Sequence, residues 1–129
     1  MQRKNFSSKT LWEPTIGYSR AVRIGDHVYI SGTTSTDKEG NILGKGNPYI
    51  QTIQIIKNIE TALQALGASL KDIVRTRIYL TDINNWEEVG KAHAEFFEEI
   101  RPTCTLVEIS SLINPEILVE MEVDANILI

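Results

Sequence analysis

The stretch NPYIQTIQIIKNIETALQALG (residues 47–67), followed by VRTRIYLT (residues 74–81), places a long helix directly before a strand. Asn47 can cap the helix, and Pro48 fits its first turn. Apolar residues then recur at helical spacing along one side: Ile53, Ile56, Ile59, Leu63 and Leu66. Gly67 is a natural end point, because glycine accepts the left-handed conformation that often follows a helix.

The predicted strand at residues 74–81 has two different faces. One face carries Val74, Thr76, Ile78 and Leu80, and the other carries Arg75, Arg77 and Tyr79. This alternation is typical of a half-buried strand. Between the helix and this strand, Ser69 with Asp72 indicates a short capped turn.

The residues before the long helix predict a hairpin. Its strands are expected at residues 19–24 and 27–31, with a turn at Gly25-Asp26 between them. Residues 33–46 are rich in Thr, Ser, Asp and Gly, so we expect a loop there.

The N-terminal segment is less regular. Asn5–Ser8 is expected to form a short edge strand. Trp12–Pro14 is expected to be irregular chain, because Pro14 pushes Glu13 toward extended geometry.

Downstream, a second helix is predicted to begin near Asn84 or Asn85 and to end before Pro102. Its apolar stripe consists of Trp86, Val89, His93, Phe96, Phe97 and Ile100. Two strands follow, at residues 103–109 and 118–124. The order of elements predicts an α+β fold for residues 1–129 as one domain, with a mixed β-sheet and two main helices packed on one face.

Composition excludes several classes of function. The net charge of −4 gives the chain of 129 residues no general attraction to phosphate polyanions, so nucleic-acid binding is not expected. No apolar run approaches the roughly 20 residues that span a bilayer. The single cysteine, Cys104, fits a reducing compartment, and we expect a cytoplasmic protein without a membrane partner.

The chain has no phosphate-binding glycine loop, no paired-histidine metal helix and no nucleophile elbow. Because His27 and His93 stand far apart in sequence, no metal site is expected. Cys104 is either a reactive thiol or a small buried hydrophobic residue, and we favour the second interpretation. His93 is either a proton donor or acceptor, or a packed histidine with one hydrogen bond, and again we favour the second.

Polar residues suggest where a small molecule could bind. One face of the last strand carries three carboxylates, Glu120, Glu122 and Asp124, which repel one another unless cations lie opposite them. The available cations are Arg20, Arg75 and Arg77. These groups form either structural ion pairs or a pocket in which Glu120 positions water or moves protons. Tyr18 and Arg20, just before the hairpin, could clamp an organic acid, although packing explains them as well.

Taken together, these segments resemble the RidA/YjgF family, also described as endoribonuclease L-PSP or enamine/imine deaminases. The most specific match is RPTCTLVEI (residues 101–109) with Leu112 and VEME (residues 119–122). Further matches are YISG (residues 29–32), residues 51–67, DIVRT (residues 72–76), LTD (residues 80–82) and Phe96-Phe97. The resemblance covers nearly the whole chain.

The resemblance implies a chorismate-mutase-like fold and a homotrimer with clefts between neighbouring subunits. It also implies hydrolysis of reactive enamines and imines to 2-oxo acids and ammonia, without a cofactor. Some members of the family are described instead as ribonucleases or translation inhibitors.

By the same resemblance, Tyr18 and Gly32 would line the cleft, and Glu120 would position the attacking water. Two positions depart from the family pattern. Active deaminases carry arginine, which holds the substrate carboxylate, where this chain has Cys104, so Cys104 is expected at the substrate-binding site together with Tyr18, Gly32 and Arg20. The deaminases also carry asparagine where this chain has Gly90.

The chain therefore resembles a branch of the family that lacks the active-site arginine. One interpretation is an enamine/imine hydrolase with an altered substrate preference, in which Arg20 or Arg77 replaces the missing cation or the substrate has no carboxylate. A second is a trimer that binds a metabolite without catalysis. A third, ribonuclease activity or inhibition of translation, is opposed by the acidic charge.

Overall fold

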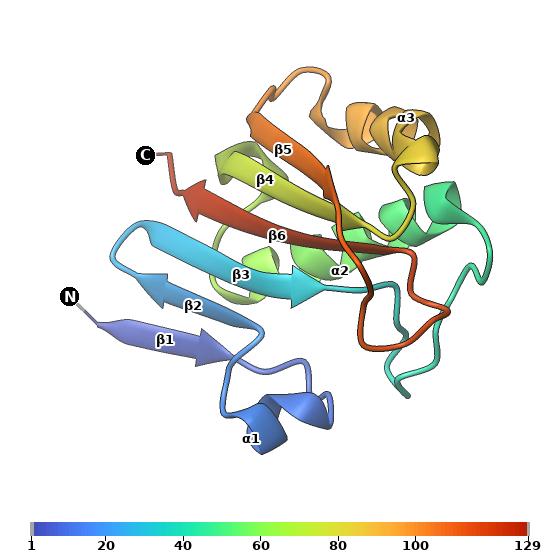
Figure 1. Cartoon of the computed structure of the whole chain (residues 1–129). Coiled ribbons are helices and arrows are strands. Elements are labelled where there is room, and N and C mark those ends of the chain that lie inside the picture. The colour runs from blue at the N-terminus through green and yellow to red at the C-terminus, as the bar shows by residue number, and fades with distance from the viewer. Residues whose placement is uncertain (1, 129) are drawn as a thin grey trace.

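The computed structural model describes residues 2–128 (Figure 1). Six strands form one sheet in the order β1-β2-β3-β6-β4-β5. Their bounds are Arg3–Phe6 for β1, Ala21–Ile24 for β2, His27–Thr33 for β3, Ile73–Leu80 for β4, Thr103–Glu108 for β5 and Val119–Asn126 for β6. The pair β4 and β5 is parallel and the other neighbours are antiparallel, so the predicted mixed sheet is confirmed.

Two main helices cover one face of this sheet, as predicted. These are α2 (Pro48–Ala65) and α3 (Trp86–Phe97). A short 3₁₀ turn, η1 (Leu70–Asp72), follows α2, and another, η2 (Ile83–Asn85), precedes α3. A third, short helix, α1 (Trp12–Ile16), lies beyond the ends of β1 and β2 (Figure 1). Within residues 2–128, no helix is both long enough and apolar enough to cross a membrane.

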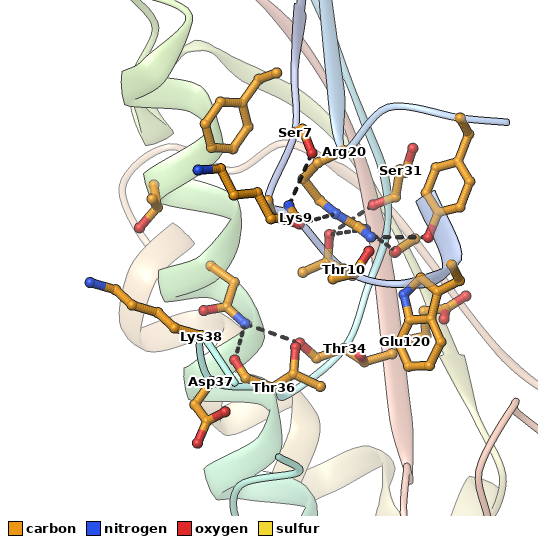
Figure 2. Close-up of a pocket in the computed structure, with 18 of the residues that line it drawn as sticks. Ser7, Lys9, Thr10, Arg20, Ser31, Thr34, Thr36, Asp37, Lys38 and Glu120 are labelled. Carbon is orange, nitrogen blue, oxygen red and sulfur yellow. Dashed lines mark hydrogen bonds between the residues drawn. The ribbon is translucent and has the colours of Figure 1, made fainter. Parts of the chain in front are cut away.

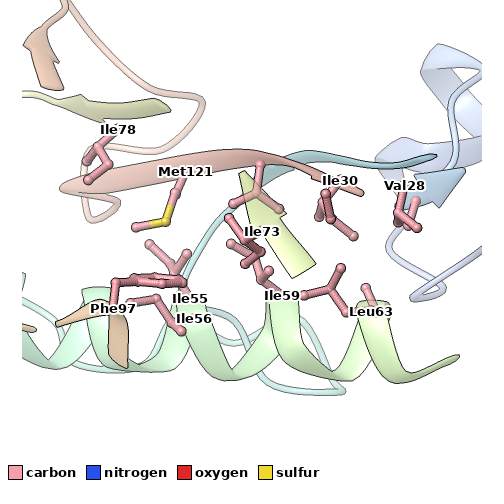
Figure 3. Close-up of a cluster of buried hydrophobic side chains, with 14 of the residues drawn as sticks. Val28, Ile30, Ile55, Ile56, Ile59, Leu63, Ile73, Ile78, Phe97 and Met121 are labelled. Atoms are coloured by element: carbon pink, nitrogen blue, oxygen red, sulfur yellow. The ribbon is translucent and has the colours of Figure 1, made fainter. Parts of the chain in front are cut away.

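The core lies between α2 and the sheet (Figure 3). The buried residues of α2 include Ile55, Ile56, Ile59 and Leu63, which meet Val28, Ile30, Ile78 and Met121 from the strands. Burying each such side chain contributes about 1.5–3 kcal/mol. The predicted stripe is wrong at Ile53, which is only half-buried, because the face of α2 that meets the sheet is centred on Ile55 and Ile59.

Both predicted ends of α2 are confirmed. The Asn47 side chain accepts a hydrogen bond from the backbone N–H of Ile50 at 3.0 Å, and Pro48 is the first helical residue. Gly67 follows the helix with a φ of +79°, a conformation in which other residues are strained.

The alternation predicted for β4 fails at its first residues. The register against β6 shifts between Ile73 and Arg75, so a bulge interrupts the pleat. As a result Ile73 joins the core, whereas Val74, which was expected to share the face of Ile78 and Leu80, is 49% exposed.

The structure also corrects the N-terminal segment. Residues 12–16, expected to be partly irregular, form α1, and the expected edge strand is β1, which lies two residues earlier than predicted. Pro14 is compatible with α1 because the first turn of a helix needs no backbone N–H from it. In α3, Val89, Ala92 and Phe97 are buried, but Trp86 is exposed rather than part of the apolar stripe.

Candidate functional site

A pocket of about 880 Å³ lies between the N-terminal segment, the end of β3 and α2 (Figure 2). Its lining includes Tyr18, Arg20, Gly32 and Glu120, four of the five residues singled out from the sequence. Most residues of the segments 7–12 and 31–38 and three polar side chains of α2 complete the larger part of the wall. The site is therefore built largely by segments before β4, and β6 contributes Glu120.

Glu120 lies in β6 on the face of the sheet that the helices leave uncovered, because its neighbours Val119 and Met121 point into the core. Gly32 in β3 makes room for it. A Cβ atom on Gly32 would lie 2.6 Å from the Glu120 Oε2 atom, which is closer than such atoms can approach. Burial raises the pKa of the Glu120 carboxyl above 4.5, although the positive charge of Arg20 opposes this rise.

Tyr18 and Arg20 contact each other at the pocket wall. Arg20 Nη2 donates to the Tyr18 hydroxyl at 3.1 Å, and the guanidinium carbon lies 5.5 Å from the centre of the tyrosine ring. Because the hydroxyl oxygen accepts this bond, its own hydrogen stays available to a ligand.

Arg20 itself is buried, and its remaining donors are directed to protein acceptors. Nε donates to Ser8 Oγ at 3.2 Å, and Nη1 donates to the Gly32 carbonyl at 2.5 Å and to Thr33 Oγ1 at 3.4 Å. The sequence suggested that Arg20 could bind a substrate anion directly. In the structure its guanidinium instead holds the pocket wall together.

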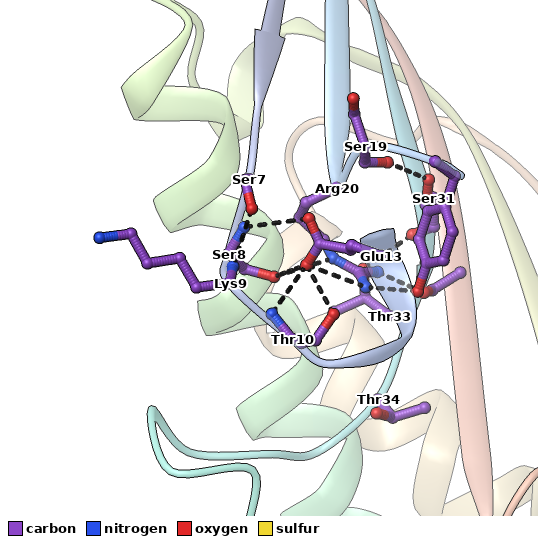
Figure 4. A network of polar contacts seen from close by, with 12 residues as sticks. Ser7, Ser8, Lys9, Thr10, Glu13, Ser19, Arg20, Ser31, Thr33 and Thr34 are labelled. Atoms are coloured by element: carbon purple, nitrogen blue, oxygen red, sulfur yellow. Dashed lines mark hydrogen bonds and ion pairs between the residues drawn. The ribbon is translucent and has the colours of Figure 1, made fainter. Parts of the chain in front are cut away.

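A glutamate that sequence reasoning did not single out, Glu13, lies beside Arg20 (Figure 4). Glu13 is 2% exposed, and its carboxylate accepts hydrogen bonds from the hydroxyls of Ser8 and Thr10, each at 2.6 Å. It also accepts from the backbone N–H groups of both residues and lies 3.9 Å from Arg20 Nη2. Burial alone would raise the pKa of Glu13, but these hydrogen bonds outweigh it and lower the pKa to about 2.

A sequence signal for Glu13 does exist. Thr10-Leu11-Trp12-Glu13 has the spacing of a capping box, in which a Glu side chain reaches back to the start of its helix. Sequence reasoning missed it because Pro14 indicated irregular chain.

The three carboxylates of β6 have separate environments. Asp124 pairs with Arg77 at 3.4 Å, and Glu122 accepts a hydrogen bond from the Tyr79 hydroxyl. These two are structural contacts on the open face of the sheet, and neither Arg77 nor Glu122 lines the pocket. Glu120 is thus the carboxylate of β6 that reaches the pocket.

Cys104 does not line this pocket. It lies on the edge strand β5 opposite Thr76 and is exposed, so its interpretation as a small buried residue is wrong for the single chain. The reason is that no further strand covers β5 within residues 2–128. Gly90 lies on α3, and a Cβ atom added there would meet no heavy atom within 4 Å.

His93 has the packed environment that we favoured. Its Nε2 atom lies 3.0 Å from Thr76 Oγ1, and its ring centre lies 4.5 Å from that of Phe97. Burial lowers the pKa of this histidine. In the described part of the chain, no three His, Cys, Asp or Glu side chains gather in a way that could hold a metal ion.

Comparison with known proteins places this geometry in a family. The profile of the endoribonuclease L-PSP family matches residues 9–127. A RutC family protein of Pyrococcus abyssi is 34% identical over 110 residues, which cover 85% of this chain and 86% of the relative. The chain belongs to the RidA/YjgF family.

Solved structures of RidA/YjgF proteins agree with the fold. A Mycobacterium tuberculosis member of the YjgF/YER057c/UK114 family is 45% identical, with a TM-score of 0.89 over 98% of this chain and all of the other. A protein described as RidA, from an Antarctic Psychrobacter, is 30% identical, with a TM-score of 0.79 over 85% of this chain and 88% of the other. The resemblance seen in the sequence is therefore confirmed at the level of family and fold.

Proposed function

We propose that this RidA/YjgF protein hydrolyses reactive enamines or imines to a ketone or 2-oxo acid and ammonia. The observation that carries the proposal is the half-buried Glu120 carboxyl in the same pocket as the Tyr18 hydroxyl. Glu120 accepts a proton from water as the water oxygen bonds to the imine carbon, the C=N π electrons move to the nitrogen, and Glu120 then passes the proton to that nitrogen. The resulting carbinolamine loses ammonia as its hydroxyl proton passes to the nitrogen, its C–N bond breaks and the carbonyl forms.

The substrate preference follows from the cations available. Cys104 stands where the family resemblance places a carboxylate-binding arginine, and a thiol offers no fork of charged donors. The donors of Arg20 are directed to the pocket wall, and Arg77 pairs with Asp124. We infer that imines without a carboxylate, or with one bound weakly, are the preferred substrates.

We further propose that the pocket is completed in a homotrimer. The edge formed by β5 and α3, with Cys104 and Gly90, would then face the Tyr18 and Glu120 pocket of the neighbouring subunit. The exposure of Cys104 in the single chain supports this arrangement.

The test is ammonia release from freshly generated 2-iminopropanoate, 2-iminobutanoate and an imine that lacks a carboxylate. We expect turnover, fastest with the uncharged imine, and at least a 100-fold loss in Glu120→Gln, in keeping with the usual contribution of a general base. Glu122→Gln is the matched control on the same strand and should keep most of the activity. Because the pKa of Glu120 is raised, the acid limb of the pH profile should lie above pH 4.5.

Unchanged turnover in Glu120→Gln would refute the role of this carboxyl.

The presence of Cys104 in place of the family arginine also favours a second function, the binding of a metabolite without catalysis. Saturable binding of the same compounds without any ammonia release, and activity appearing only in Cys104→Arg, would establish that function instead.

A further inference from the structure

The wall of the pocket formed by residues 7–16 is held in an unusual way. In α1, the single buried side chain is Glu13, whereas Ile16 is 68% exposed and Leu11, just before the helix, is 86% exposed. Short helices normally pack against the rest of the protein through apolar side chains. Here the Glu13 carboxylate makes the buried contacts of the helix. Its hydrogen-bond partners Ser8 and Thr10 line the pocket, as does its chain neighbour Trp12.

A chain of direct contacts links Glu13 to the proposed reacting groups, Tyr18 and Glu120. Glu13 Oε2 lies 3.9 Å from Arg20 Nη2, and the same nitrogen donates to the Tyr18 hydroxyl at 3.1 Å. Arg20 Nη1 donates to the Gly32 carbonyl, and Gly32 lies against the Glu120 side chain. One buried ion pair, Glu13 with Arg20 (Figure 4), thus connects the N-terminal wall to Tyr18 and to Gly32 beside Glu120.

The pair also matters as a pair of charges. Arg20 is buried beside Glu13, so each compensates the other, and removing one leaves an uncompensated charge in the wall. The charged groups that act on Glu120 are Arg20, which favours its ionised form, and Glu122, which opposes it. Tyr79 lies opposite Glu120 in the sheet, with its hydroxyl bonded to Glu122.

We propose that Glu13 is a positioning residue: through Arg20 it fixes the Tyr18 hydroxyl and the Gly32 carbonyl and sets the electrostatic potential that Glu120 experiences. Any effect of Glu13 on catalysis rests on the proposed function, but the electrostatic coupling between Glu13 and Glu120 is a property of the folded chain. It can be measured whether or not any substrate reacts.

The decisive experiment is a ¹³C NMR titration of the Glu120 carboxyl in the full-length protein, with its signal assigned by its loss in Glu120→Gln. In Glu13→Gln the charge of Arg20 is no longer compensated, so the pKa of Glu120 should fall. In Arg20→Gln it should rise, because the cation is gone. The double variant should return toward the wild-type value.

Glu116→Gln is the matched control. It removes the same charge from a carboxylate that pairs with Lys45 at 3.5 Å and does not line the pocket. The proposal is overturned if Glu13→Gln moves the titration of Glu120 no more than this control does, or if Arg20→Gln moves it in the same direction as Glu13→Gln.

A milder variant covers the case in which Glu13→Gln fails to fold. Ser8→Ala keeps every charge but removes one hydrogen bond to Glu13 and one from Arg20. With Trp86→Phe as background, Trp12 becomes the sole tryptophan, and its collisional quenching by acrylamide should increase in Ser8→Ala. Unchanged quenching in this variant would contradict the anchoring role.

Turnover separates the two proposals. If the enzyme is active, the acid limb of its pH profile should move to lower pH in Glu13→Gln and stay in place in Glu116→Gln. If no variant reacts with any imine, the proposed hydrolase is refuted, while the NMR titration still decides whether Glu13 acts on Glu120.

Discussion

The hydrogen bonds that Glu13 accepts are made by its ionised form, so its contribution to stability depends on pH. Its pKa falls from about 4.5 in the unfolded chain to about 2 in the folded one. A depressed carboxyl pKa stabilises the folded state above the unfolded value, and this stabilisation is lost as pH falls from about 4.5 to 2. At roughly 1.4 kcal/mol per pKa unit, the full contribution is about 3 kcal/mol.

We therefore expect Glu13→Gln to unfold more easily than the wild type at pH 7, and the difference in unfolding free energy to shrink as the pH falls below 4.5. Urea unfolding at fixed protein concentration, at pH 7, 5 and 3, measures this difference. Ser19→Ala, near the same wall, is a control without a titrating group. A difference that stays constant with pH would mean that the ionised carboxylate is not the stabilising form.

Single residues also show where sequence reasoning reached its limit. Tyr18, Gly32 and Glu120 were expected in one site by family resemblance, and the structure brings all three to one pocket. The partners of Arg20 could not be foreseen, because they depend on how residues 8–18 close back on β3. The path of residues 8–18 is fixed by the hydrogen bonds of Glu13 to Ser8 and Thr10. These bonds lie in an irregular turn, so no periodic pattern in the sequence predicts them.

Among the elements, α2 positions the chain that leads into β6. Gln51 of α2 is fully buried, and its Nε2 donates to the carbonyls of Glu116 at 2.9 Å and Gly44 at 3.3 Å. Its Oε1 accepts from the N–H of Leu118 at 2.9 Å. One side chain thus satisfies three backbone groups, two of them just before the strand that carries Glu120.

Replacing Gln51 by Met should lower the free energy of unfolding by about 2–6 kcal/mol, because the Glu116 carbonyl and the Leu118 N–H lose their partners at about 1–3 kcal/mol each. Gln64→Met, at an exposed position of the same helix, should change it by less than about 0.5 kcal/mol. Chemical unfolding of both variants measures the two effects. Equal losses of unfolding free energy in the two variants would show that the hydrogen bonds of Gln51 add no stability beyond the difference in helix propensity between Gln and Met.

At this scale the sequence predicts the long elements well and the short or irregular ones poorly. The caps of α2 and the alternation in β6 are local patterns, and both appear as expected. The bulge at Val74 and the helix α1 are not visible as patterns. The bulge depends on pairing with β6, about 50 residues later, and α1 depends on one buried polar side chain, Glu13.

For the whole molecule, the order of the sheet leaves β5 at one edge beside α3, while the pocket lies near the other half of the sheet. Two residues at which this chain departs from the family pattern, Cys104 and Gly90, lie on that edge and not in the pocket. A trimer would bring such an edge to a neighbouring pocket. This separation is what the proposed trimer requires, because a neighbouring subunit would then supply the second half of the site.

A bulky side chain at position 90 tests this arrangement. A Cβ atom there meets nothing within 4 Å in the single chain, and most residues favour a helix more than glycine does, so Gly90→Trp should leave the folded subunit intact. If the protein is a trimer and α3 faces a neighbour, the wild type should sediment as a trimer and the variant mainly as a monomer. Cys104 should then react faster with a thiol reagent than in the wild type.

Lys57→Trp, at an exposed position of α2, is the control and should remain trimeric. A Gly90→Trp protein that keeps the mass of a trimer and the wild-type thiol reactivity would place the interface elsewhere, and the pocket would then have to act with the residues of one chain alone.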